Sequence, residues 1–468
     1  MSFNKIPVEL MTKILNNYMS DESSLEGSDQ RLVHTLRLGL INRRSRAIAL
    51  AESHIWKTIH LHWPEEIVDE YLRRAQQNGI SLFLDTFCGP HDKATIDTNI
   101  QRWSAFLQSN MAAFKHLDLC IRSAACSQAL SAALETSAPH LQTFKLVLGN
   151  FQITKNLFAG NAPALRTAHL DTRHSLEITS FPFLSTASLR VCQENCRRIL
   201  LALQSMSQLE DITLFGTEDY TDVPAQAATR RRRRLRPIVL PFCRRLRIRN
   251  MVSFSVRRLM ANIRAPLLED LEIRETVTVA DDALIPTPIP LALASVPRSP
   301  VDPTALHIEL HADRVRIKLD GTTRLHYLSD WSRVQTVAPG DHRVLDAVTN
   351  LLTSLSTISG GQPVTISIDN NIFCHSAPLT LLKGMNMHLL WSRVFCAYPH
   401  VHTLEVAGDV TEASEILFNL GRNSILPLLS RLHIRSIRPG TLLPMYKLQR
   451  IQEVRDLELV LPQIDGAL

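Results

Sequence analysis

The sequence lacks most features that mark an enzyme or a membrane protein. It has only 16 glycines in 468 residues, and it contains no Gly-x-Gly-x-x-Gly, no Gly-x-Ser-x-Gly, no His-Glu-x-x-His and no phosphate loop ending in Gly-Lys-Ser or Gly-Lys-Thr. Its longest uncharged apolar stretch, residues 284–296, contains three prolines and is too short and too broken to span a membrane. We therefore expect a protein with no active site, no cofactor, no metal site and no membrane segment.

The excess of positive over negative charge is confined to a single segment. Lys and Arg total 51 against 45 Asp and Glu, a formal net charge of +6. That excess equals the six arginines of one basic cluster, which consists of Arg230, Arg231, Arg232, Arg233, Arg234 and Arg236. An excess confined to one segment disfavours a general nucleic-acid binder, which spreads it over a face. The cluster is either a nuclear-localisation element, a docking site for an acidic or phosphorylated partner, or a solvated insert.

The eight cysteines do not indicate a disulfide framework. They are scattered through a long chain, and several alternate with apolar residues, as in Leu119-Cys120-Ile121. The chain begins Met-Ser-Phe-Asn-Lys, without the apolar stretch of a signal peptide. We expect reduced thiols, and a location in the cytoplasm, the nucleus or both.

One apolar pattern recurs through most of the chain. Its template is an apolar residue, two variable ones, an apolar residue, one variable and a last apolar residue, as in Phe114-Leu117-Leu119. It begins at positions 114, 141, 165, 184, 209, 243 and 268, lapses, and returns at 401, 429 and 454. The last two apolar positions alternate with polar ones, which predicts a short strand, and residues 129–134 and 199–203 have helical spacing. Prolines just before many of the strands end the preceding helices. This pattern predicts an α/β solenoid with one parallel sheet.

The region from about residue 80 onward resembles leucine-rich-repeat proteins of the irregular kind, although the Asn that ends the motif in regular members is mostly absent. Two interruptions, a basic insert at 216–237 and a Pro-rich segment at 276–305, are expected to be exposed loops. Residues 306–319 indicate a hairpin or one long strand. Outward-facing residues of the concave strand face are candidates for binding a target protein: Asp118, Lys145, His169, Glu210, Asp211 and Glu272.

The first 63 residues differ in kind from the repeats. Pro7 fits the first position of a helix, and Leu10, Met11, Ile14, Leu15 and Tyr18 follow at helical spacing. A second helical stretch is predicted over residues 32–51. A third short unit contains Ile55, Trp56 and Ile59. Trp56 is expected to anchor this region to the first repeat, because a large indole is best used where both of its faces are packed.

The order of these pieces resembles the F-box, a helical motif that binds the Skp-type adaptor of cullin-RING ubiquitin ligases. The matching parts are Ile6-Pro7-Val8-Glu9-Leu10 with Ile14-Leu15, then Leu40-Ile41-Asn42-Arg43-Arg44, then Ile55-Trp56-Lys57-Thr58-Ile59. Two departures are Ser45, where the family usually has Trp, and a polar insert at residues 20–30. The resemblance implies an apolar adaptor-binding surface formed by Pro7, Leu10, Ile14, Leu15 and Leu40. The alternative is a helical cap that only shields the first repeat.

The predicted fold class is an α/β solenoid, an irregular leucine-rich-repeat-like region preceded by a small all-helical F-box-like module. The expected domains are the module at 1–63, the solenoid at 64–275, the Pro-rich loop at 276–305 and the continued solenoid at 306–468. By this resemblance the protein is a substrate receptor that joins a Skp-type adaptor and cullin scaffold to an unidentified target protein. The alternative is a ligase-independent repeat scaffold.

Overall fold

The structure is a computed structural model that forms two compact units, Met1–Arg190 and Val191–Leu468. It describes residues 6–20, 28–40, 42–75, 79–86, 93–121, 124–149, 156–172, 181–192, 195–216, 237–277, 279–280, 283–284, 305–311, 313–321, 323–332, 334, 342–354, 356, 363–371, 386–408, 416, 419–420, 425–436, 445–454 and 457–461. Each unit is considered in turn.

The first unit begins with a bundle of three helices, α1 (Val8–Ser20), α2 (Ser28–Leu40) and α3 (Arg43–Ala51), followed by the 3-10 helix η3 (Ser53–Trp56). The helix predicted to start near Pro7 is confirmed. The single helical stretch predicted over residues 32–51 is wrong, because the chain breaks into α2 and α3. Asn42 causes the break by capping α3, since its Oδ1 accepts hydrogen bonds from the Ser45 backbone N–H (2.7 Å) and hydroxyl (3.0 Å).

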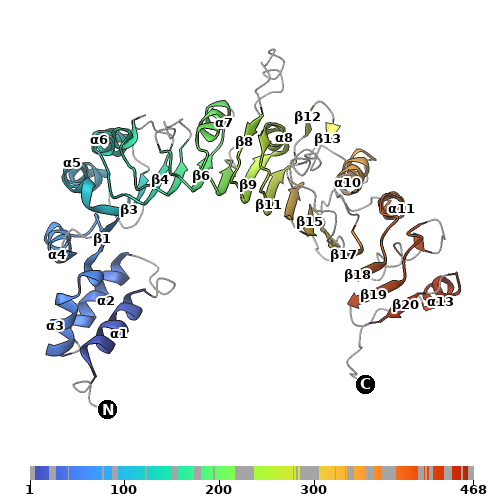
Figure 1. Cartoon of the computed structure of the whole chain (residues 1–468), viewed down its shortest axis with the longest axis horizontal. Coiled ribbons are helices and arrows are strands. Elements are labelled where there is room, and N and C mark those ends of the chain that lie inside the picture. The colour runs from blue at the N-terminus through green and yellow to red at the C-terminus, as the bar shows by residue number, and fades with distance from the viewer. Residues whose placement is uncertain are drawn as a thin grey trace. The chain divides into compact units, whose positions relative to one another are not determined.

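Six strands of the first unit pair in chain order as a parallel sheet. They are β1 (Thr58–His60), β2 (Ile80–Asp85), β3 (Phe114–Ile121), β4 (Thr143–Leu148), β5 (Thr167–Asp171) and β6 (Thr186–Arg190). The intervening helical elements are α4 (Glu65–Ala75), α5 (Lys93–Asn110), η4 (Met111–Ala113), α6 (Ala124–Leu134) and η5 (Leu157–Gly160). Figure 1 shows α4, α5 and α6 along one side of these strands.

Trp56 joins the helical bundle to the first repeat. Its indole N–H donates to the Ala49 carbonyl at 2.8 Å, and its ring lies edge-on to Tyr71 of α4 with the centroids 4.9 Å apart. The side chain is buried, and the Arg74 guanidinium lies 4.2 Å from the ring centroid. The predicted anchoring role of Trp56 is therefore confirmed.

The second unit carries the remaining strands of the repeats. They are β7 (Asp211–Phe215), β9 (Arg245–Val252), β11 (Asp270–Thr276), β14 (Ala305–His311), β15 (Arg314–Asp320), β16 (Arg324–Asp330), β17 (Thr365–Asn371), β18 (Thr403–Gly408), β19 (Arg431–Ser436) and β20 (Glu458–Val460). Two small pairs lie outside this ladder: β8 (Ile238–Val239) with β10 (Ile263–Arg264), and β12 (Val279–Ala280) with β13 (Ala283–Leu284). The strand predicted at each of the ten template positions is confirmed across the two units.

Helices of the second unit lie along one side of its strands in Figure 1. They are α7 (Cys196–Ser205), α8 (Ser253–Met260), α10 (His342–Ser354), α11 (Met387–Ala397) and α13 (Met445–Val454). Among the described residues of either unit, no helix combines the length and apolar character needed to cross a membrane.

The section where the template lapses contains an antiparallel meander inside an otherwise parallel ladder. The hairpin predicted at 306–319 is confirmed as β14 and β15, and β16 adds a third strand. The order β11-β16-β15-β14-β17 is the reverse of the chain order within the meander. Because β15 alone runs the other way, both outer strands can pair in parallel with their repeat neighbours, β16 with β11 and β14 with β17.

Alternation along the strands produces the core. In β3, Leu117 and Leu119 are buried, while His116 and Asp118 on the other face are partly exposed. The first template position is buried as well, as at Phe114 and Leu141. Each repeat thus closes one layer of a continuous apolar core under the helices.

A buried polar contact interrupts this core in the second unit. The Tyr327 hydroxyl on β16 donates to Glu275 Oε1 on β11 at 2.5 Å, and both side chains are buried. Burial, together with the negative charge of Glu275, holds the pKa of Tyr327 well above its ordinary value, so the phenol keeps its proton and its role as donor.

Replacing Tyr327 with Phe should lower the free energy of unfolding by about 1–3 kcal/mol, because Glu275 loses this donor while still buried. Urea unfolding followed by circular dichroism measures the change. The matched control is Tyr18→Phe, at a tyrosine that is 40% exposed. Equal stability of the two variants would contradict the prediction.

Candidate interaction surfaces

Apolar side chains stand exposed on the three-helix bundle. Pro7 is exposed, and Leu10, Ile14 and Leu40 are 54%, 50% and 81% exposed. Exposure of these four side chains is what an adaptor-binding surface requires, and their role in binding stays a prediction. Leu15 does not, and its placement on that surface is wrong: it is buried, because it shares the inner face of α1 with Met11 and Met19, four residues away on either side.

The exposed apolar surface is larger than the sequence predicted. Val8 and Tyr18 of α1, and Val33 and Leu36 of α2, are also at least 40% exposed. The signal for exposure is that α1 has apolar residues on two faces, and a helix in a small bundle can bury only one of them. Exposed apolar side chains in such number are typical of surfaces that contact other molecules.

A groove of about 400 Å³ lies beside this surface, between α2, α3 and α4. Its apolar lining includes Leu36, Leu40, Leu50, Trp56 and Tyr71. Its rim carries both signs of charge, because Arg74 forms an ion pair with Glu70 and also covers the Trp56 ring. The groove therefore extends the apolar surface from α2 onto the first repeat.

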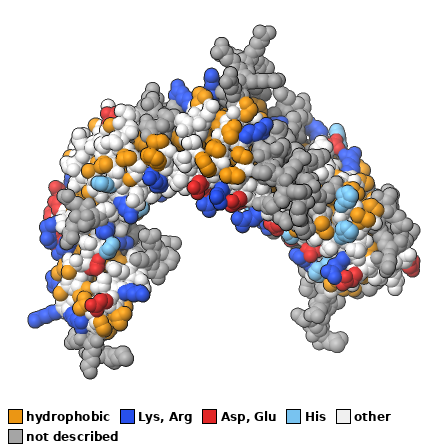
Figure 2. Space-filling view, in the orientation of Figure 1, with side chains coloured by type: hydrophobic (Ala, Val, Ile, Leu, Met, Phe, Trp, Pro, Cys, Tyr) orange, Lys and Arg blue, Asp and Glu red, His pale blue; other side chains and the backbone are white. Residues whose placement is uncertain are grey.

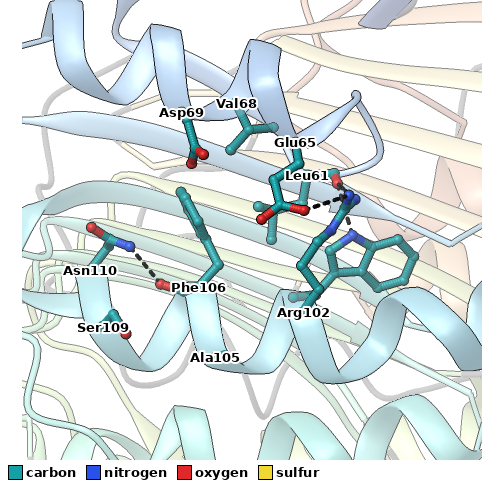
Figure 3. A pocket seen from close by; sticks show the side chains of 10 residues that line it. Leu61, Glu65, Val68, Asp69, Arg102, Ala105, Phe106, Ser109 and Asn110 are labelled. Atoms are coloured by element: carbon teal, nitrogen blue, oxygen red, sulfur yellow. Dashed lines mark hydrogen bonds and ion pairs between the residues drawn. The ribbon is translucent and has the colours of Figure 1, made fainter.

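A second hollow, of about 280 Å³, lies between α4 and α5 (Figure 3). The Arg102 guanidinium lies 3.9 Å from the Glu65 carboxylate, and the Trp103 indole N–H donates to the Leu61 carbonyl at 2.8 Å. These polar groups are engaged within the chain, and the contacts connect α5 to α4 and to Leu61 just before it. The hollow is therefore the space between the helices of two successive repeats.

On the strand face of the first unit, three predicted target-binding residues come together. Asp118, Lys145 and His169 occupy one row across β3, β4 and β5. Lys145 Nζ lies 2.8 Å from Asp118 Oδ2. Burial lowers the pKa of His169, with a smaller opposing effect from Asp171 and a further lowering by Lys145. The imidazole is therefore held in its neutral form more strongly than a free histidine.

On the strand face of the second unit, Asp211 and Glu272 flank β9 on either side. Three arginines, Arg245, Arg247 and Arg249, alternate along β9 on this face, and we call them the arginine column. Although burial raises the pKa of Glu272, the hydrogen bonds and charges of Arg249 and Arg274 hold it below the ordinary value. Glu210 differs from its prediction, because it precedes β7 and lies exposed outside the strand face.

Other candidates contribute less. The basic cluster, Arg230–Arg234 with Arg236, lies outside the described residues. Within the described part of the chain, no group of three or more His, Cys, Asp or Glu is placed to hold a metal ion. The six described cysteines are free thiols, and burial raises the pKa of Cys243 to about 12, which suits a core residue.

The fold is that of a leucine-rich-repeat-like α/β protein, with strands of successive repeats paired in parallel and helices along one side. No protein-family model matches the sequence, and no curated protein matches it. Among solved structures, one similar chain is in a crystal structure of a TLR13–ssRNA13 complex, with 14% identity over 75% of this chain and a TM-score of 0.30. This chain spans 46% of the length of that one. Another is the leucine-rich repeat-containing protein LegL7 from Legionella pneumophila, with 9% identity, a TM-score of 0.24, and coverage of 71% of this chain and 87% of that one.

Replacing Lys145 with Gln should raise the pKa of His169, because a like charge beside the imidazolium is removed. Asp171→Asn should lower the same pKa further, because an opposite charge is lost. Histidine NMR titration measures both, with His169→Gln identifying the resonance. A shift of the same sign in both variants would contradict this account of the row.

Proposed function

We propose that this protein is a substrate receptor of a cullin-RING ubiquitin ligase. The three-helix bundle binds a Skp-type adaptor, and the strand faces of the repeats bind a target protein. The observation that carries the proposal is the exposed apolar surface of α1 and α2, which lies in the segment whose residue order resembles the F-box.

The surface offers enough apolar area for a specific contact. Fully burying a large aliphatic side chain contributes roughly 1.5–3 kcal/mol, so the exposed halves of Leu10 and Ile14 contribute about 1 kcal/mol each. Leu36 and Leu40 add larger exposed areas on α2. Several such residues in one patch provide the hydrophobic centre that stable interfaces require.

Ser45, which departs from the usual Trp, lies away from this surface. It is completely buried, and its hydroxyl and backbone N–H both donate to Asn42. Ser45 therefore contributes to the capping of α3 and is not one of the exposed side chains of α1 and α2.

The proposed receptor contributes to ubiquitin transfer by proximity. It has no chemical role in the reaction, and holding the target near the charged enzyme raises the effective concentration of the reacting groups. Surfaces on different elements suit such a role, because the adaptor and the target then contact different residues.

Replacing both Leu10 and Ile14 with Asp should abolish adaptor binding, because two charges would be buried without partners in an apolar contact at a cost of several kcal/mol. Co-expression of the full chain with a Skp-type adaptor, followed by gel filtration, measures the effect. Both side chains are about half exposed, so the free protein should remain folded.

The matched control is Val239→Asp with Leu267→Asp, which places the same charges on exposed apolar residues of the second unit. This control should retain the adaptor. If the unaltered, folded chain forms no complex, or if both double variants behave alike, the ligase role is overturned and a repeat scaffold with a helical cap remains.

A further inference from the structure

The arginine column is an arrangement of charge that neither the core nor the adaptor surface uses. Arg245, Arg247 and Arg249 are separated by single residues, and the intervening Leu246 and Ile248 are buried. Their side chains therefore leave the same face of β9, about 6.6 Å apart from one to the next. Arg274 on the neighbouring strand β11 lies beside Arg249, the last arginine of the column.

The acidic side chains beside the column are more buried than the arginine side chains. The side chains of Asp211 and Glu272 are 11% and 13% exposed, whereas those of the four arginines are between 27% and 53% exposed. A partner that approaches this face meets the arginines first. Figure 2 shows blue and red side chains gathered together along the strand side of this part of the molecule.

The carboxylates are shared among more arginines than they can neutralise. Glu272 lies 2.6 Å from both Arg249 and Arg274 and 3.8 Å from Arg247. Asp211 lies 3.1 Å from Arg245 and 3.2 Å from Arg247. Asp270 lies opposite Arg245 in the ladder, at the end of the column away from Arg249. Positive charge is therefore in excess around Arg249 and Arg274, which share the Glu272 carboxylate.

Shared carboxylates also orient the arginines. Arg249 uses two of its nitrogens, Nε and Nη2, on Glu272, which leaves its other N–H groups directed elsewhere. Guanidinium groups held in this way lose little further freedom when a ligand binds. The face is a pre-organised row of donors for anions.

We propose that this face binds an extended, carboxylate-rich segment of a target protein, with acidic side chains at alternate positions. Side chains on one face of an extended peptide repeat at the same distance as those of the arginine column, so each acidic side chain meets one guanidinium group. The role of the segment as part of a ligase target rests on the proposed function. The binding itself does not depend on the adaptor.

The test is fluorescence polarisation with the full chain and a short fluorescein-labelled peptide in which Glu alternates with Thr. Three comparison peptides have the Glu residues contiguous, Gln in place of Glu, or phosphoserine in place of Glu. The alternating peptide should bind several-fold more tightly than the contiguous one, the Gln peptide should not bind, and added salt should weaken binding.

Arg249→Gln with Arg274→Gln should weaken binding of the alternating peptide by about tenfold, because charge-assisted hydrogen bonds are lost. The matched control is Arg314→Gln with Arg431→Gln, which removes two cations of similar exposure from β15 and β19. It should leave binding unchanged. Arg249→Lys with Arg274→Lys retains charge beside Glu272 and guards against misfolding. Its affinity for the alternating peptide should lie between those of the unaltered chain and the Arg249→Gln, Arg274→Gln variant.

The proposal is overturned if the alternating peptide does not bind, if the contiguous or Gln peptide binds equally well, or if the control variant loses as much affinity. Binding of the phosphoserine peptide alone would also overturn it, since the ligand would then be a phosphorylated segment. Failure of the proposed function is a separate result: the Leu10 and Ile14 variant reports on the adaptor, and the Arg249 and Arg274 variant should retain it.

Discussion

Burial of one face of the parallel strand ladder is the constraint on which the other features depend. Each repeat must place two alternating apolar side chains under a helix or loop, as Leu117 and Leu119 do in β3. The opposite face of the same strand is then free to carry any polar residue. Charge at Asp118, Lys145 or Arg247 therefore does not disturb the core, and the repeats can vary their strand face without losing the fold.

Sequence alone predicted the strands whose three template positions are all apolar, and it missed those where one position is occupied otherwise. In the strands β2, β16 and β17 the first position holds Gly79, Thr322 and Pro363. In β1 the first position is Trp56, which fits the template but was assigned to the helical module. The break at Asn42 was missed because a cap depends on one side-chain hydrogen bond, which apolar spacing does not report.

The candidate surfaces were predicted unevenly for a similar reason. Position on a helix wheel separated polar from apolar residues, but it did not decide which of two apolar faces of α1 points inward, so Leu15 was placed with Leu10 and Ile14. Alternation along β9 was visible in the sequence as arginines at every second position. Their relation to Asp211 and Glu272 was not, because it depends on the pairing register of β9 with β7 and β11, which apolar spacing does not report.

The reversed strand order of the meander affects how the second unit can be assembled. In a simple repeat array each strand finds its partner in the next repeat to be synthesised, so structure can grow one layer at a time. Here the edge of β11 stays open until β16 has been made, and β17 pairs with a strand that was made earlier than β16. The parallel ladder can therefore extend from β11 to β17 only after the whole meander has been made, and the edge of β11 stays unpaired until then.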